Sequence, residues 1–161
     1  MGKPETAQGG HAAEGLPGVA PRRWPKYVDK AGGCLDNDHF SCQKDQVYAG
    51  KHLILDFWGA TQLDNPALME ATLRRCVDAA GATLLHLHLH RFSPTGGLSG
   101  VAVLAESHIS VHTWPEKGFA AFDIFMCGET RPERAVDTLK RAFDPQRVAV
   151  TEHLRGVIRG R

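Results

Sequence analysis

Hydrophobic and polar residues alternate along this chain with two different periods, and each change of period marks a predicted element. Residues 52–58 form a short apolar run that ends before Gly59, which predicts a buried strand. A helix is expected next, because Asn65 and Pro66 have the pattern of an N-cap followed by proline in the first turn. Apolar residues then recur at helical spacing until Gly81, at Leu73, Cys76, Val77 and Ala80.

Residues 83–91 alternate between leucine and histidine, and this period of two predicts a strand. The alternation places His86, His88 and His90 on one face. Two of them lie close enough to share a metal ion, but a polar strand face satisfied by hydrogen bonds is the preferred interpretation. Residues 100–105 and 108–112 predict two further strands.

A second strand and helix are predicted in the C-terminal half of the chain. Residues 119–126 form an apolar strand that ends at Cys127. Thr130 and Glu133 have the spacing of a capping box, so a helix is expected directly afterwards. Its apolar face would consist of Ala135, Val136, Leu139, Ala142 and Phe143. Residues 147–154 predict the last strand.

Together these elements predict an α/β (α+β) fold, a two-layer sandwich in which a largely antiparallel sheet carries helices on one face. The two strand-then-helix segments each contain a central aspartate, Asp56 and Asp123. They suggest a possible internal βαβ-type repeat. The periods predict a fold but no reaction.

Composition excludes several classes of protein. The length of 161 residues, with 42% hydrophobic residues, predicts one folded domain. A net charge of +1 provides no basic surface for nucleic acid. No apolar run approaches the roughly 18 residues that would span a bilayer, and residues 1–20 lack the apolar block of a signal peptide. We therefore expect a cytoplasmic protein without nucleic-acid or membrane partners.

Residues 1–48 are rich in Gly, Ala, Pro and charge without a sustained period, and they predict a flexible N-terminal extension ahead of a domain over 49–161. The chain has four cysteines and no CxxC pair, so we expect reduced thiols. Cys34, His39 and Cys42 are metal-ligand types, but their spacing is unconvincing and no metal is assigned.

Reactive side chains concentrate between residues 93 and 127, but generic motifs do not explain them. No G-x-S-x-G elbow surrounds Ser99 or Ser107, which argues against a serine hydrolase. No local signature supports a cysteine protease either. Four segments together nevertheless carry a long and ordered match: Phe92-Ser93-Pro94, Ser99-Gly100-Val101, the block AESHISVHTWPE from Ala105 to Glu116, and Cys127-Gly128.

Over roughly residues 50–155 this pattern resembles the prokaryotic S-adenosylmethionine decarboxylase proenzymes, which depend on a pyruvoyl group. The resemblance implies autocatalytic cleavage between Glu106 and Ser107, leaving residues 1–106 and 107–161. Ser107 would become the covalent pyruvoyl group, whose ketone forms a Schiff base with the substrate amine. The implied activity converts S-adenosylmethionine to its decarboxylated form and CO₂ for spermidine biosynthesis.

The resemblance also assigns roles to other residues. His112 would be the processing base, Ser99 a second processing residue and Cys127 the proton donor in decarboxylation. Residues 107 and 112 are an odd number apart, so a straight strand would direct them to opposite faces. We therefore expect a bend or bulge between Ser107 and His112.

For the substrate, the resemblance implies that Phe92 and Trp114 enclose adenine and that Glu116 contacts the ligand. It further implies a homodimer of cleaved protomers with active sites near the subunit interface. The chain departs from the common pattern in its long N-terminal segment, in Arg91, in Lys117 and in the turn at residues 95–98. These departures leave the cleavage and proton-donor positions intact.

Two alternatives stay open from the sequence. A decarboxylase of the same fold could act on ornithine or arginine instead. Alternatively, the chain could be an unprocessed homologue that regulates an active decarboxylase, although such a partner has no need of Ser99, Glu106, Ser107, His112 and Cys127 together.

Overall fold

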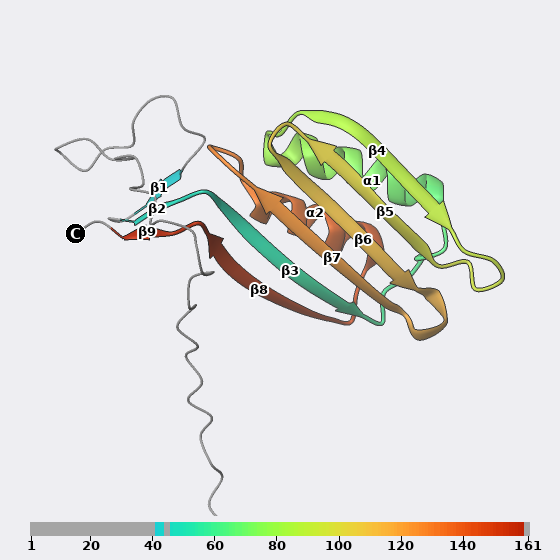
Figure 1. The fold of residues 1–161 in the computed structure, drawn as a ribbon. Coiled ribbons are helices and arrows are strands. Elements are labelled where there is room, and N and C mark those ends of the chain that lie inside the picture. The colour runs from blue at the N-terminus through green and yellow to red at the C-terminus, as the bar shows by residue number, and fades with distance from the viewer. Residues whose placement is uncertain (1–40, 44–45, 160–161) are drawn as a thin grey trace, which may run out of the picture.

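A computed structural model describes residues 41–43 and 46–159, and in this part of the chain two helices lie against one face of a six-stranded sheet (Figure 1). The strands are β3 (Gly50–Trp58), β4 (Leu84–Arg91), β5 (Leu98–Leu104), β6 (Ser107–Trp114), β7 (Phe119–Met126) and β8 (Arg147–Arg155). The helices are α1 (Pro66–Ala80) and α2 (Pro132–Phe143), with a short 3₁₀ turn η1 (Pro115–Lys117). The strand order is β4-β5-β6-β7-β3-β8, and every neighbouring pair is antiparallel. The predicted fold class is confirmed.

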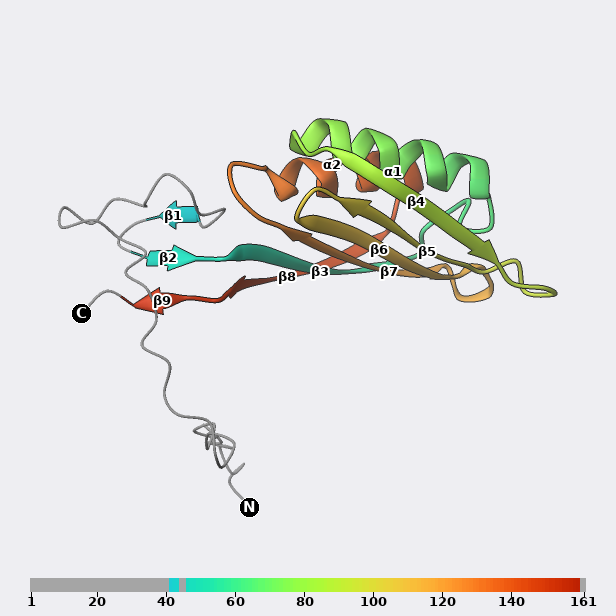
Figure 2. The same cartoon turned by 45° about the horizontal axis from the view of Figure 1, so that its top comes forward.

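The alternation of side chains along the strands defines two faces of this sheet. Leu55 on β3, Phe122 on β7 and Ile109 on β6 belong to the face beneath the helices and are fully buried. No helix of the described chain covers the opposite face, as Figure 2 shows from the side. We call that opposite surface the open face.

The predicted limits of α1 are confirmed. The Asn65 side chain accepts a hydrogen bond from the backbone N–H of Leu68 at 3.1 Å, which satisfies one of the first-turn donors. Gly81 ends the helix at φ 73°, a conformation that glycine adopts without steric cost. The predicted apolar stripe of this helix is buried against the sheet, at Leu73, Cys76, Val77 and Ala80.

The predicted capping box at α2 is wrong. The helix begins at Pro132, and Arg131 occupies the N-cap position without a side-chain hydrogen bond. Thr130 lies one residue too early to cap the helix, and its hydroxyl instead donates to the carbonyl of Cys127 at 2.8 Å. Glu133 forms an ion pair with Lys51 at the start of β3. Both side chains thus fix neighbouring segments and leave the helix uncapped.

The histidine strand β4 forms one edge of the sheet. His86, His88 and His90 lie opposite Val103, Val101 and Ser99 on β5, so they share the open face as predicted. The register shifts between Leu84 and His86. Within the described ranges, no group of three or more His, Cys, Asp or Glu side chains is arranged to hold a metal ion.

Two strand–helix–strand units build the sandwich, β3–α1–β4 and β7–α2–β8. In both units the two strands run parallel but are not neighbours, because β5, β6 and β7 lie between β4 and β3, and β3 lies between β7 and β8. Asp56 and Asp123 occupy central strands and both belong to the open face. The topology therefore contains both units from which the internal repeat was predicted.

A smaller sheet, which the periodicity did not predict, lies beyond one end of the main one. It pairs β1 (Ser41–Gln43), β2 (Gln46–Tyr48) and β9 (Ile158–Arg159) in the order β1-β2-β9. Only Ala49 separates β2 from β3, so the β2–β9 ribbon continues the β3–β8 ribbon (Figure 2). None of the helices in the described ranges has the length and apolar character needed to cross a membrane.

Candidate active site

The predicted site residues lie in two groups toward opposite ends of strand β6. The cleavage group comprises Glu106, Ser107 and Cys127, at the end where β6 begins. The recognition group lies toward the other end and comprises Phe92, Ser99, His112, Trp114 and Glu116. The resemblance assigned all of these residues to one reaction, and the structure divides them between the two ends of a strand.

The cleavage group is built on the tight turn between β5 and β6. Ala105 and Glu106 form this turn and are exposed. Glu106 has φ 63°, a left-handed conformation that costs a residue with a Cβ of the order of 1 kcal/mol or more. Ser107 follows as the first residue of β6 and is 9% exposed. The backbone strain is therefore located directly at the bond predicted to break.

Cys127 lies beside Ser107, at the end of the neighbouring strand. It is the first residue after β7, and its backbone N–H donates to the Ser107 hydroxyl at 3.2 Å. Cys127 is a free thiol. Burial raises the pKa of this thiol above its ordinary value, and the nearby Glu106 carboxylate raises it further. The thiol therefore keeps its proton to a higher pH than an exposed cysteine would.

Ser99 and His112 form a hydrogen-bonded pair within the recognition group. They are cross-strand partners on β5 and β6, and the Ser99 hydroxyl lies 2.7 Å from Nδ1 of His112. The imidazole is exposed on the open face. We call this pair the Ser99–His112 dyad.

The predicted bend or bulge between Ser107 and His112 is absent. Strand β6 pairs residue by residue with β5 and β7 without a register shift. Ser107 therefore belongs to the helix-covered face and His112 to the open face. Five residues of strand separate the two positions by about 16 Å. The dyad of one chain does not approach the serine of the same chain.

A row of aromatic side chains begins beside the dyad and extends along the open face. Trp114 is 39% exposed, and its ring lies 6.4 Å from that of His112 and 5.4 Å from that of Phe119. Phe119 in turn lies 5.7 Å from Trp58, whose ring lies 3.7 Å beneath the Arg147 guanidinium. Sequence reasoning found Trp114 but missed the other three, because only the pairing of β6, β7, β3 and β8 brings them together.

Two further recognition residues border this region. Phe92 follows β4, is 48% exposed and packs against His90 at a ring distance of 4.6 Å. Glu116 is exposed in η1, the short 3₁₀ turn that follows Trp114. Both are available to a ligand that approaches the open face at this end.

A polar network on the open face, between the middle of β6 and its cleavage end, was not predicted. Nε2 of His52 lies 3.2 Å from an oxygen of Asp123, and the Ser110 hydroxyl donates to the other oxygen at 3.4 Å. The His108 ring packs against Phe125 at 5.7 Å. Burial lowers the pKa of His108, and the neighbouring His52 lowers it further. The only sequence signal for this network was the placement of polar residues at alternate strand positions.

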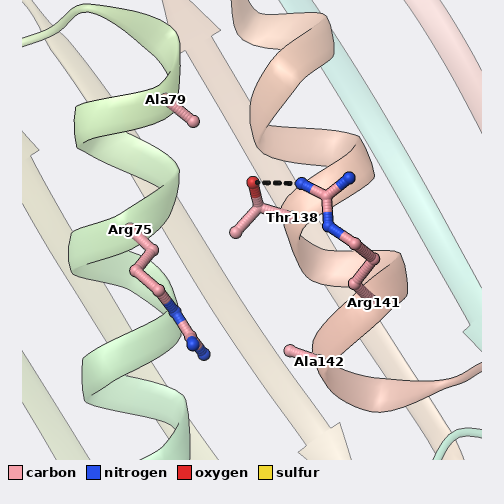
Figure 3. A pocket seen from close by; sticks show the side chains of 5 residues that line it. All are labelled: Arg75, Ala79, Thr138, Arg141 and Ala142. Atoms are coloured by element: carbon pink, nitrogen blue, oxygen red, sulfur yellow. Dashed lines mark hydrogen bonds between the residues drawn. The ribbon is translucent and has the colours of Figure 1, made fainter.

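A groove between the helices is separate from both groups. It has a volume of about 430 Å³ and is lined by Arg75, Ala79, Thr138, Arg141 and Ala142 (Figure 3). All five residues belong to α1 or α2, and none was predicted to take part in the chemistry.

Comparison with known proteins agrees with the fold and with the family that the sequence resembles. The S-adenosylmethionine decarboxylase family matches residues 51–156. The S-adenosylmethionine decarboxylase proenzyme of Thermomicrobium roseum is 46% identical over 110 residues, which cover 68% of this chain and 95% of that protein. The proenzyme of Methanococcus vannielii is 47% identical over 112 residues, covering 68% of this chain and 91% of the relative.

A solved structure of a similar decarboxylase has the same fold. The adenosylmethionine decarboxylase of Aquifex aeolicus superposes with a TM-score of 0.64 at 32% identity, covering 71% of this chain and 96% of that one. The fold is thus that of a two-layer decarboxylase domain. The chain belongs to the S-adenosylmethionine decarboxylase family.

Proposed function

We propose that this chain is a self-cleaving proenzyme that matures into a pyruvoyl-dependent S-adenosylmethionine decarboxylase and supplies spermidine biosynthesis. The observation that carries the proposal is the contact of Ser107 with Cys127 at a strained acidic turn. This arrangement combines the residue that would become the cofactor with the predicted proton donor. A thiol that acts as an acid must stay reduced, which fits a cytoplasmic enzyme.

Cleavage needs only groups that the chain itself contains, together with water. The Ser107 hydroxyl attacks the carbonyl carbon of Glu106, and the backbone C–N bond breaks as an ester forms. Loss of the Ser107 Cα proton then breaks the bond between Cβ of Ser107 and the ester oxygen, which releases the Glu106 carboxylate. One water molecule hydrolyses the remaining dehydroalanine to a pyruvoyl group and ammonia. The left-handed Glu106 favours the first step, because breaking the peptide relieves its strain.

Ser107 fits the pyruvoyl group that the family implies, since it is the first residue of β6 and its hydroxyl accepts a hydrogen bond from the backbone N–H of Cys127. When formed, that group supplies a carbonyl that accepts the electrons left when the substrate carboxylate departs as CO₂. Cys127 then donates its proton to the substrate carbon. The raised pKa of its thiol keeps this acid protonated at neutral pH.

The Ser99–His112 dyad does not supply the base for cleavage within one chain, because it lies about 16 Å along the strand from the serine of that chain. A homodimer that packs two open faces together can supply this base. In an antiparallel pair, the dyad end of one sheet lies over the cleavage end of the other. The Ser107 side chain points to the helix-covered face, but the Glu106–Ser107 bond adjoins the exposed turn at the end of the sheet. Each His112 would then reach this bond of the partner at the end of the sheet, with Ser99 holding its imidazole.

The open face has the composition expected of such an interface. Its exposed apolar side chains include Ile54, Val103 and Trp114, and the described helices cover none of them. A second copy is the occupant that these observations favour, because it both covers this apolar surface and completes the catalytic groups. Active sites then form in pairs between the two sheets.

Phe92, Trp114 and Glu116 are the proposed substrate-binding residues. Exposed aromatic rings can stack on adenine, and a carboxylate favours a sulfonium cation. Their position beside the dyad implies that one protomer binds the adenosyl group while the other holds the pyruvoyl group.

Substrate identity is tested by CO₂ release from carboxyl-labelled S-adenosylmethionine, ornithine and arginine with the same purified protein. We expect release from S-adenosylmethionine alone. Release from ornithine or arginine but not from S-adenosylmethionine would replace the substrate while keeping the pyruvoyl chemistry. A protein that stays uncleaved and inactive on all three would favour the regulatory homologue.

A further inference from the structure

Cys127 is placed by a turn, and the regular pairing of the sheet does not fix it. It lies one residue past the end of β7, and Gly128 follows it with φ 64°. The direction of its thiol therefore depends on the hydrogen bonds that hold residues 127 and 128 in place.

Three hydrogen bonds hold this turn, one from within it and two from other segments. Ser107 on β6 accepts from the Cys127 N–H at 3.2 Å, and the Thr130 hydroxyl donates to the Cys127 carbonyl at 2.8 Å. The third comes from the small sheet, where the Ser41 hydroxyl donates to the Gly128 carbonyl at 2.8 Å. The family match covers residues 51–156, so Ser41 is the only one of these partners that lies outside it.

The segment that carries Ser41 is tied back to the main sheet. Strand β1 pairs with β2, and only Ala49 separates β2 from β3. Strand β3 then pairs with β7 up to Lys51 and Met126, the residue before Cys127. The contacts therefore form a closed ring from Cys127 through Ser41 and back to Met126. A ring of this kind restrains the turn more than an isolated hydrogen bond on a free tail would.

We propose that Ser41 is a positioning residue for Cys127, through which the segment preceding the family domain helps direct the proton in decarboxylation. The proposal rests on the function proposed above. It gives residues before 51 a role in the fidelity of the reaction, which the sequence pattern did not suggest.

The chemistry requires accurate placement because two adjacent carbons compete for the proton. Protonation of the substrate carbon gives the decarboxylated product. Protonation of the cofactor carbon leaves the substrate nitrogen there, and hydrolysis by one water then releases an aldehyde and a chain that begins with alanine. A displacement of about an ångström is sufficient to change such a partition.

The test compares Ser41→Ala, Ser41→Thr and wild type as full-length proteins. Thr61→Val is the matched control, because the Thr61 hydroxyl also donates to a backbone carbonyl, that of Phe143 at 3.3 Å, beyond the other end of β3. The readout is the fraction of small chains that Edman degradation finds to begin with alanine after a fixed number of turnovers. A pyruvoyl end is blocked to this reaction.

We expect Ser41→Ala to raise this fraction and to lower kcat by roughly two- to tenfold, the range for one hydrogen bond. KM should change little. Ser41→Thr should restore the alanine fraction and kcat to their wild-type values, and Thr61→Val should match wild type in both. An unchanged alanine fraction in Ser41→Ala would overturn the proposal, provided wild type turns over. A wild type without any pyruvoyl end would instead overturn the proposed function.

A second measurement does not depend on turnover. In the His112→Ala precursor, which we expect to stay uncleaved and which keeps the hydrogen bond from the Cys127 N–H to Ser107, the alkylation rate of Cys127 at pH 8 can be followed by peptide mass spectrometry. Adding Ser41→Ala should raise this rate, because a looser turn exposes the thiol to solvent. Equal rates with and without Ser41→Ala would contradict a positioning role.

Discussion

The Ser99 hydroxyl and Nδ1 of His112 lie 2.7 Å apart on the open face, on the side of the sheet opposite to Ser107. The strand between His112 and Ser107 is regular, so no local rearrangement brings the imidazole to the scissile bond. A hydroxyl that holds the imidazole fixes its orientation and tautomer, as expected for a base. We propose that this base acts on the turn at Glu106 and Ser107 of a second copy of the chain.

Cleavage in trans predicts complementation between two inactive chains. His112→Ala and Ser107→Ala should each stay uncleaved when expressed alone. When the two are co-expressed, the His112→Ala chain should be cleaved, because the Ser107→Ala partner supplies an intact dyad. Differential tags and mass spectrometry identify which chain is cut. If the His112→Ala chain stays intact in verified mixed dimers, the dyad does not act across the interface.

Cys127→Ala should separate cleavage from decarboxylation. The Ser107 hydroxyl is still present in this variant, so both chains should form. Turnover should fall by roughly 10²-fold or more, the usual effect of losing a general acid. The small chain should accumulate an alanine end, which Edman degradation detects. Turnover at the normal rate with a stable cofactor would assign the proton donor to another residue.

The pH dependence of Cys127 reactivity should reveal its two neighbours. Burial is the larger cause of its raised pKa and the Glu106 carboxylate the smaller. In the His112→Ala precursor, which keeps the contact between Ser107 and Cys127, the midpoint of alkylation against pH should therefore lie above that of an ordinary thiol. Adding Glu106→Gln removes the charge and should move the midpoint down, though not fully to the ordinary value. A midpoint that does not move would mean that Glu106 exerts no field on the thiol.

His108 should make the protein less stable in acid. Its folded-state pKa lies below the ordinary histidine value, so the unfolded chain binds more protons as the pH falls. Stability from this residue is complete above about pH 6.5 and decreases as the pH falls through that value. Urea unfolding of the Ser107→Ala precursor between pH 5 and 8 should therefore show a shallower acid loss with His108→Gln. If stability falls equally with pH in both proteins, His108 does not contribute to the loss of stability in acid.

Local patterns were sufficient to predict most of the fold. Asn65, Pro66 and Gly81 set the limits of α1, because caps act within a few residues of themselves. The capping box at Thr130 failed because the same spacing serves a different contact, the hydrogen bond to Cys127. The small sheet was missed because its strands have two or three residues each, too few for a period.

The site was predicted in its members but not in its arrangement. Motifs identified Ser99, Glu106, Ser107, His112 and Cys127 as one set, and the strand register divides that set between two ends of β6. The odd separation between positions 107 and 112 correctly indicated that Ser107 and His112 face opposite sides of the sheet. The expected bend or bulge that would bring them together within one chain was wrong. A sequence does not show whether two residues of a motif act within a protomer or between protomers. Ser41 carried no signal, because its contact with Gly128 depends on the path of the chain.

The mass of the purified protein tests the central claim most directly. We predict that the 17.6 kDa chain is replaced by two fragments divided between Glu106 and Ser107, the smaller of them blocked to Edman degradation by its pyruvoyl end. Ser107→Ala measured in parallel should stay whole. A wild-type chain that keeps its full mass after prolonged incubation, with no blocked fragment, would contradict the account.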